Sequence, residues 1–203
     1  MAFPNASQPL NIVDVSNRGT QTMNAPYGGQ QVMFILRLAD VGYDVPSLDT
    51  IIVPLTCRSA WMSGHTSSEY CPEAEPQTAQ AAYQAFERGY MVWRADSPNT
   101  TKIVWIYLNE TGTFTTAPDF YAGETLLFDE TPPAGLYQPI NGFGKIWIDD
   151  AYLREQLGWA IAPEQGYTMT YQHAGRSLGT GGSRFTVFTL PDGTSVSGMI
   201  ASF

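Results

Sequence analysis

The stretch GLYQPINGFGKIWIDDAYLREQLGWAIAPEQGY, residues 135–167, decides how the chain is organised. Pro139, Gly142 and Gly144 are turn-forming residues, because proline fixes φ and glycine tolerates backbone conformations that other residues avoid. They predict a loop. The run Lys145–Ile148 that follows is rich in β-branched and aromatic residues, so it predicts a short strand.

A short helix is predicted directly after this strand. Asp149 or Asp150 suits its N-cap, because a short carboxylate accepts hydrogen bonds from the free N–H groups of the first turn. Leu153 and Leu157 lie four residues apart and therefore share one face. Gly158 stands where the chain has to leave the helix. We expect a helix over residues 150–157 that acts as a structural joint between two β-rich segments.

The composition is that of an acidic, β-rich protein. Charged residues make up 14% of the 203 residues and aromatic residues 13%, a balance that suits half-buried sheet surfaces. The formal net charge is −9, and the lysines are Lys102 and Lys145 alone. Such a chain is repelled by phosphate backbones and has no basic stripe, so nucleic acid is not an expected partner.

No stretch approaches the roughly 18 consecutive apolar residues of a transmembrane helix, and we expect no transmembrane segment. The start, MAFPNASQPLN, has neither the basic nor the apolar region of a signal peptide.

Cys57 and Cys71 flank a loop that is rich in serine and glycine. They are either two independent thiols or a disulfide, and we favour the disulfide. A ring of this size stabilises a fold by about 3 kcal/mol, because it restricts the unfolded chain. Such a bond is typical of an oxidising, extracellular compartment.

The first 70 residues divide into an arm and a β segment. Residues 1–30 are polar and turn-rich, and we expect an extended N-terminal arm that is either partly ordered or paired with the sheet edge of another copy. Residues 31–70 contain two predicted strands, 31–38 and 50–56. The first is nearly continuous in apolar residues, which is typical of a strand covered on both faces. Pro54 marks the second as an edge strand or a bulge.

The remaining chain contains two segments that resemble each other, residues 71–134 and 135–203. Strands are predicted at residues 90–94, 103–108 and 113–116, whereas the Ala- and Gln-rich residues 73–86 are also compatible with a helix. Short motifs recur in the same order: Pro72-Glu73 and Pro163-Glu164, Tyr83-Gln84 and Tyr171-Gln172, and the hairpins that contain Trp105–Leu108 and Phe188–Leu190. Such repetition predicts related structural units. The predicted fold class is mainly β, with two related β-hairpin modules joined by a short helix and a β-containing N-terminal segment.

Three stretches carry a resemblance: FERGYMVWR (Phe86–Arg94), IVWIYLNETGTF (Ile103–Phe114) and PPAGLYQPINGFGKIWIDDAYLREQLGWAIAPEQGY (Pro132–Tyr167). They resemble the β-hairpin repeats of secreted and cell-surface Chloroflexota-type proteins and, more distantly, the LGFP repeats of cell-wall-associated proteins. The resemblance covers residues 71–194 and leaves residues 1–70 outside. It implies an extracellular, non-enzymatic accessory or surface role, and it brings no catalytic residues with it.

No recognisable catalytic or cofactor-binding motif is present. The two histidines, His65 and His173, lack zinc-ligand spacing, and neither a G-x-S-x-G motif nor a P-loop occurs. A thiol nucleophile beside His65, or a catalytic pair of carboxylates, has no further support in the sequence. We therefore expect no enzymatic activity, no metal and no cofactor.

Tryptophans are the candidate ligand-binding residues. Trp93, Trp105, Trp147 and Trp159 lie in predicted strand or joint segments, where packing in the core is the simpler interpretation. Trp61, between the two cysteines, is the best candidate for an exposed platform that stacks on a sugar ring, because loops often carry function. Trp93 and Trp147 are the next candidates.

The leading functional hypothesis is a non-enzymatic extracellular structural or assembly protein. Its partners are copies of itself, polymerised by strand exchange through the arm at residues 1–30. The strand-like residues 196–203 offer a sheet edge to another chain. The alternative is a carbohydrate- or cell-wall-binding surface module that holds extracellular polysaccharide with exposed aromatic side chains.

Overall fold

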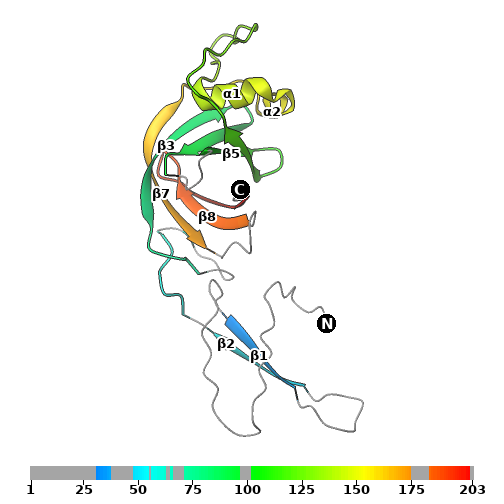
Figure 1. Ribbon diagram of the computed structural model, residues 1–203, viewed down its shortest axis with the longest axis vertical. Coiled ribbons are helices and arrows are strands. Elements are labelled where there is room, and N and C mark those ends of the chain that lie inside the picture. Colours follow the sequence, from blue (N-terminus) through cyan, green and yellow to red (C-terminus); the bar gives the residue numbers. More distant parts are fainter. Residues whose placement is uncertain are drawn as a thin grey trace.

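The computed structural model describes residues 31–37, 48–54, 56–62, 65, 71–96, 102–174 and 183–201, so the predicted arm at residues 1–30 lies outside the described residues. Strands β1 (Gln31–Arg37) and β2 (Leu48–Pro54) form a two-stranded antiparallel sheet. The body (Figure 1) contains β3 (Gln77–Phe86), β4 (Gly89–Arg94), β5 (Lys102–Leu108), β6 (Thr113–Asp119), α1 (Asn141–Asp149), α2 (Ala151–Leu157), β7 (Gln165–Ala174), β8 (Ser183–Thr189) and β9 (Ser195–Ala201). The mainly β fold class is confirmed.

The body is one curled antiparallel sheet with the strand order β6-β5-β4-β3-β7-β8-β9. Its curl brings the two edge strands together: the Phe114 ring of β6 lies so close to Gly198 of β9 that an added Cβ would stand 2.7 Å from the ring. Strands from both predicted modules share this sheet. The module boundaries, and the division into two modules, therefore stay a prediction.

The centre of the sheet is the pair β3 and β7, which have ten residues each. Small residues of β3 lie opposite large residues of β7, with Ala81 opposite Tyr167 and Ala79 opposite Met169. Strand β3 is paired with β4 on one side and with β7 on the other. This pairing overrides the helix propensity of its alanine and glutamine residues and explains why the segment is a strand.

The bonds around this pair recur at an offset of 88 residues. The Gln84 side chain donates from Nε2 to the carbonyl oxygen of Ala162 (3.0 Å), and the Gln172 side chain donates from Nε2 to that of Ala74 (2.8 Å); the residue numbers differ by 88 for both donors and acceptors. In the same way, Glu73 N donates to His173 O and Ile161 N to Ala85 O. The two ends of the β3–β7 ladder are thus tied by matching contacts.

Strand β8 corresponds in position to β4. Phe188 lies opposite Tyr171 as Val92 lies opposite Tyr83. The sequence motifs instead match Phe188–Leu190 with Trp105–Leu108, which would make β8 the counterpart of β5. In the sheet the counterpart of β8 is β4.

The joint differs from its prediction in one element. The predicted strand at residues 145–148 is wrong, because α1 covers Asn141–Asp149 and the joint therefore has two helices. Gly142 and Gly144 serve close packing and not a loop: a Cβ on Gly144 would lie 2.5 Å from the carbonyl oxygen of Pro139. The second helix is confirmed as α2, with Asp150 accepting a hydrogen bond from Leu153 N (2.9 Å) and Gly158 at its end with φ +73°.

Two apolar clusters lie on the two faces of the sheet. The helices cover one face with Phe143, Ile146, Trp147, Leu153 and Leu157, which pack on Phe86, Met91, Val104 and Ile106. The inner face of the curl holds Val92, Trp105, Met169, Tyr171 and Phe188. Since both faces are covered, strands such as β5 carry apolar residues at successive positions.

Gly89 and Gly166 make a matched test of this packing. A Cβ on Gly89 would overlap the carbonyl oxygen of Tyr107 in β5 and approach Leu157 of α2 to 2.9 Å, whereas nothing lies within 4 Å of a Cβ on Gly166. We expect Gly89→Ala to lower the free energy of unfolding by at least about 2 kcal/mol and Gly166→Ala to change it by less than about 0.5 kcal/mol. Urea unfolding measures both, and equal effects would contradict the packing described.

Candidate functional site

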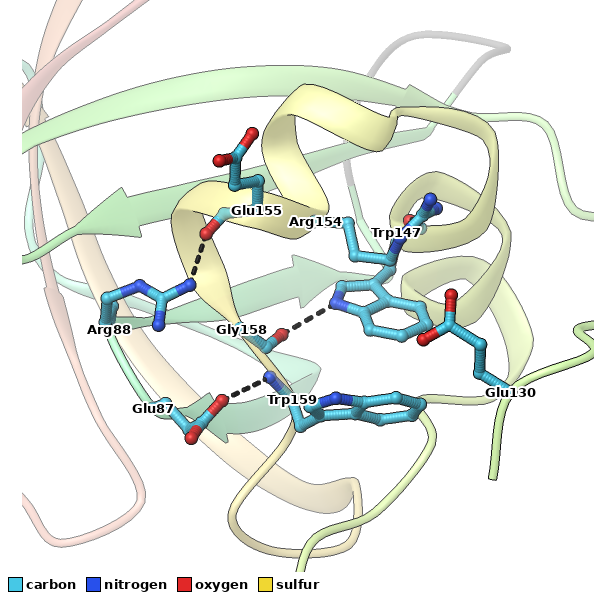
Figure 2. Close-up of a pocket in the computed structure, with 8 residues that line it drawn as sticks. All are labelled: Glu87, Arg88, Glu130, Trp147, Arg154, Glu155, Gly158 and Trp159. Carbon is cyan, nitrogen blue, oxygen red and sulfur yellow. Dashed lines mark hydrogen bonds between the residues drawn. The ribbon is translucent and has the colours of Figure 1, made fainter. Parts of the chain in front are cut away.

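A pocket of about 230 Å³ opens between the β3–β4 turn, the end of α2 and the loop that precedes α1 (Figure 2). Its lining consists of Glu87, Arg88, Glu130, Trp147, Arg154, Glu155, Gly158 and Trp159. The pocket therefore lies where the joint meets the sheet, in the part of the sequence with the sharpest local pattern.

Trp147 is the buried, hydrogen-bonded residue of the pocket lining. It stands in the last turn of α1, is only 1% exposed, and donates from Nε1 to the carbonyl oxygen of Gly158 (2.8 Å). The Glu87 carboxylate accepts from Trp159 N (2.8 Å). A Cβ on Gly158 would collide with that carboxylate, so only glycine allows both contacts at the exit of α2.

The aromatic wall consists of three rings. The Trp147 and Trp159 centroids are 4.8 Å apart, and Phe128 packs edge-on against both, at 5.0 and 6.0 Å. The Arg154 guanidinium lies over the rings of Phe128 and Trp147, with centroid distances of 5.0 and 5.4 Å. It also donates to the carbonyl oxygens of Trp147 and Ile148, where a cation complements the helix dipole.

The polar rim combines bound and unbound groups. Arg88 donates to the carbonyl oxygens of Gln156 and Glu155 at the end of α2. The side chains of Glu130 and Glu155 are exposed and have no hydrogen bond or ion pair to the described residues. Figure 2 shows the Glu130 carboxylate beside the Trp147 and Trp159 rings and the Glu155 carboxylate pointing away from them, so Glu130 is the acceptor that the rim offers beside guanidinium groups of fixed position.

The predicted ligand-binding tryptophans occupy three different places. Trp147 belongs to the pocket. Trp61 is partly buried and packs against the rings of His65 and Phe185, at 4.7 and 5.7 Å. Trp93 is partly buried against the core that the helices cover. The structure does not bring the three together, and their ligand-binding roles stay a prediction.

Trp159 has two roles, of which the sequence predicts one. It packs against the core as expected, and it also lines the pocket as a partly buried residue. No local pattern in the sequence marks the second role.

The Cys57–Cys71 disulfide is confirmed. The segment between the cysteines is held to the sheet by Gln172, whose Oε1 accepts from Met62 N (2.7 Å) and whose Nε2 donates to Ala60 O (2.8 Å). Gln172 thus clamps the Trp61 segment to β7. Burial lowers the pKa of His65 in this segment, so its ring is neutral at pH 7.

The sequence also does not predict an aromatic row that runs along the inner face of the sheet. Neighbouring centroids from Tyr83 through Tyr90 and Tyr107 to Phe114 are 5.6, 4.9 and 5.1 Å apart. Burial raises the pKa of Tyr90, with smaller contributions from the neighbouring tyrosines. Tyr90 is therefore uncharged at neutral pH, and Tyr83, Tyr90 and Phe114 of the row pack against the inner apolar cluster.

Within the described ranges, no helix is long and apolar enough to cross a bilayer, and no group of three or more His, Cys, Asp or Glu side chains is arranged to hold a metal. Comparisons with protein-family models, curated proteins and solved structures found no match. The resemblance to the cell-surface repeats therefore remains an expectation.

The two pocket tryptophans should differ in their contribution to the free energy of unfolding. Trp147→Phe removes the donor to Gly158 O and leaves a buried carbonyl unpaired beside a small cavity, so we expect a loss of about 2–3 kcal/mol in unfolding free energy. Trp159→Phe keeps an aromatic ring at a partly exposed position and should cost about 1 kcal/mol or less. Urea unfolding of both variants checks the order, and a larger loss for Trp159→Phe would contradict it.

Proposed function

We propose that the protein is a non-enzymatic, extracellular structural protein that assembles with copies of itself, and that the β1–β2 hairpin is the contact surface. One observation carries the proposal. Large apolar side chains of this hairpin are between 36% and 61% exposed, namely Met33, Phe34, Ile35, Ile51, Ile52 and Val53.

The exposed residues lie on both faces of the hairpin. Successive side chains of a strand point to opposite faces, so Met33 and Phe34 are on different sides. Their partners across the ladder, Ile52 and Ile51, extend each face. The sequence predicts a strand covered on both faces, and the described residues do not supply that cover. Another molecule would supply it.

Physical chemistry favours association of such an element. An isolated two-stranded hairpin is marginally stable in water, and contiguous exposed apolar surface marks interaction sites. Burial of that surface stabilises by roughly 25 cal/mol per Å². Among the described strands, β1 and β2 pair only with each other, and a two-stranded sheet can be extended by strand addition.

A second copy is the partner that fits best. The six exposed apolar side chains of the hairpin carry no charge, whereas the whole chain carries −9, so a contact between these side chains avoids direct repulsion between like charges. Two identical apolar faces are self-complementary about a two-fold axis. Figure 1 shows the hairpin standing away from the sheet of the body, which leaves room for two bodies around a shared contact.

Two further features support this setting. The disulfide is typical of an oxidising compartment, and β9 is the last strand in the order of the seven-stranded sheet, although the curl places it beside β6. Strand exchange through residues 1–30 remains a prediction beside the hairpin contact.

Charged substitutions on the hairpin test the proposal. We expect the native chain to be larger than a monomer by size-exclusion chromatography with light scattering. Met33→Lys/Ile52→Lys on one face and Phe34→Lys/Ile51→Lys on the other should shift it to monomer, because lysine cannot be buried in an apolar contact without a large cost. The control, Leu127→Lys, removes an 81% exposed apolar side chain from the body and should leave the mass unchanged.

A native chain that is monomeric over the whole accessible concentration range would overturn the proposal. So would assemblies that persist in both hairpin variants, or a monomer that binds phospholipid vesicles through the hairpin. Circular dichroism of each variant confirms that the body is folded.

A further inference from the structure

We infer that the Trp147–Trp159 pocket binds a single neutral sugar ring, presented at the end or on a branch of a polysaccharide. The pocket lies on the body, at the joint, and not on the β1–β2 hairpin. The inference is therefore independent of self-association.

The size of the pocket limits the ligand. Pockets for drug-sized ligands have volumes of about 300–1,000 Å³, and this one has about 230 Å³. It accommodates a ligand of about one ring. Because it is open to solvent at the rim, the rest of a longer chain can continue outside it.

One wall is suited to stacking. Trp159 lines the pocket and is partly exposed, while Trp147 behind it is buried and held by its bond to Gly158. The Glu87 carboxylate fixes the Trp159 backbone from the other side. The Trp159 indole is therefore a rigid apolar surface, because Glu87 holds its backbone and its ring packs against the fixed ring of Trp147. A rigid surface loses little conformational entropy when a ligand binds.

The charges of the lining nearly cancel. Three carboxylates face two guanidinium groups, and Glu87, Arg88 and Arg154 are already hydrogen-bonded within the protein. The lining therefore gives an ionic ligand little net attraction to offset the loss of its hydration, a cost that a neutral ligand does not have.

The hydrogen-bonding groups favour hydroxyls. The Glu130 carboxylate lies beside the two indoles and is an acceptor with no partner among the described residues, whereas the arginines supply only donors. A hydroxyl both donates and accepts, so neighbouring hydroxyls of a sugar can satisfy carboxylate and guanidinium together. Hydrogen bonds to charged groups are the stronger kind. An aromatic platform beside such a rim therefore selects a polyhydroxylated ring.

The test uses neutral hexasaccharides built from glucose in β and α linkage, from mannose and from N-acetylglucosamine, with choline chloride and sodium glucuronate as ionic probes. Binding is followed by tryptophan fluorescence and isothermal titration calorimetry on the full chain. We expect saturable binding of at least one neutral oligosaccharide and none of either ionic probe.

Variants locate the binding. Glu130→Gln keeps the shape of an exposed side chain, and we expect it to weaken binding by about fivefold through the loss of a charged acceptor beside the indoles. The matched controls are Glu155→Gln, whose side chain points away from the indoles, and Glu110→Gln outside the pocket; each removes the same charge from an exposed site and should leave the affinity within about twofold. Trp159→Phe should weaken binding and reduce the quenching of fluorescence.

Several results would overturn the inference. They are the absence of saturable binding by every neutral probe, binding of choline or glucuronate that depends on Glu130, and sugar binding that is equal in Glu130→Gln and its controls. Thermal unfolding of each variant shows whether a lost signal reflects a lost fold.

Discussion

The antiparallel pairing of β3 with β7 is the constraint on which the rest of the structure depends. It joins the two halves of the chain in the middle of the sheet, and every other strand of the body is added outward from it. Two buried glutamines, Gln84 and Gln172, tie its ends to the connecting segments. A buried polar side chain is stable only when it is hydrogen-bonded, so these contacts fix the register as well as the pairing.

The two sides of this pair carry different elements at corresponding places. At Gln172 the Oε1 atom accepts from the disulfide segment through Met62 N. At Gln84 the Oε1 atom is buried and has no partner among the described residues, and the same holds for the nearby Trp93 Nε1. Near Gln84 the sheet is covered by the helices α1 and α2, and the pocket forms beside them. Near Gln172 the disulfide segment takes the corresponding place. The candidate binding site therefore depends on this difference between the two ends of the β3–β7 pair.

The sequence predicts those elements whose signals are local. β1, β2, β4, β5 and β6, the Asp150 cap, the Gly158 exit and the disulfide all follow from residue patterns of a few positions. The sequence does not predict the helix α1, because glycines usually indicate a turn. In this helix Gly142 and Gly144 instead allow Asp119 and Pro139 to approach closely. The strand β3 was ambiguous because its alanines gain strand character only from β4 and β7 on either side.

The candidate site was less predictable than the fold, for a physical reason. Trp147 and Trp159 meet across a helix end, and Glu130 reaches them from a loop with no regular pattern. No spacing rule connects residues that tertiary packing brings together. In contrast, the apolar run at β1 was visible in the sequence, and the structure adds that the described residues leave it uncovered.

Native-state hydrogen exchange measures the central role of the β3–β7 pair most directly. We expect the backbone amides bonded between these two strands to exchange most slowly and together, at a rate set by global unfolding, and the amides of the edge strands β6 and β9 to exchange through local opening. Stronger protection in β5–β6 or β8–β9 than in β3–β7 would show that the sheet is held together from its edges and not from its centre.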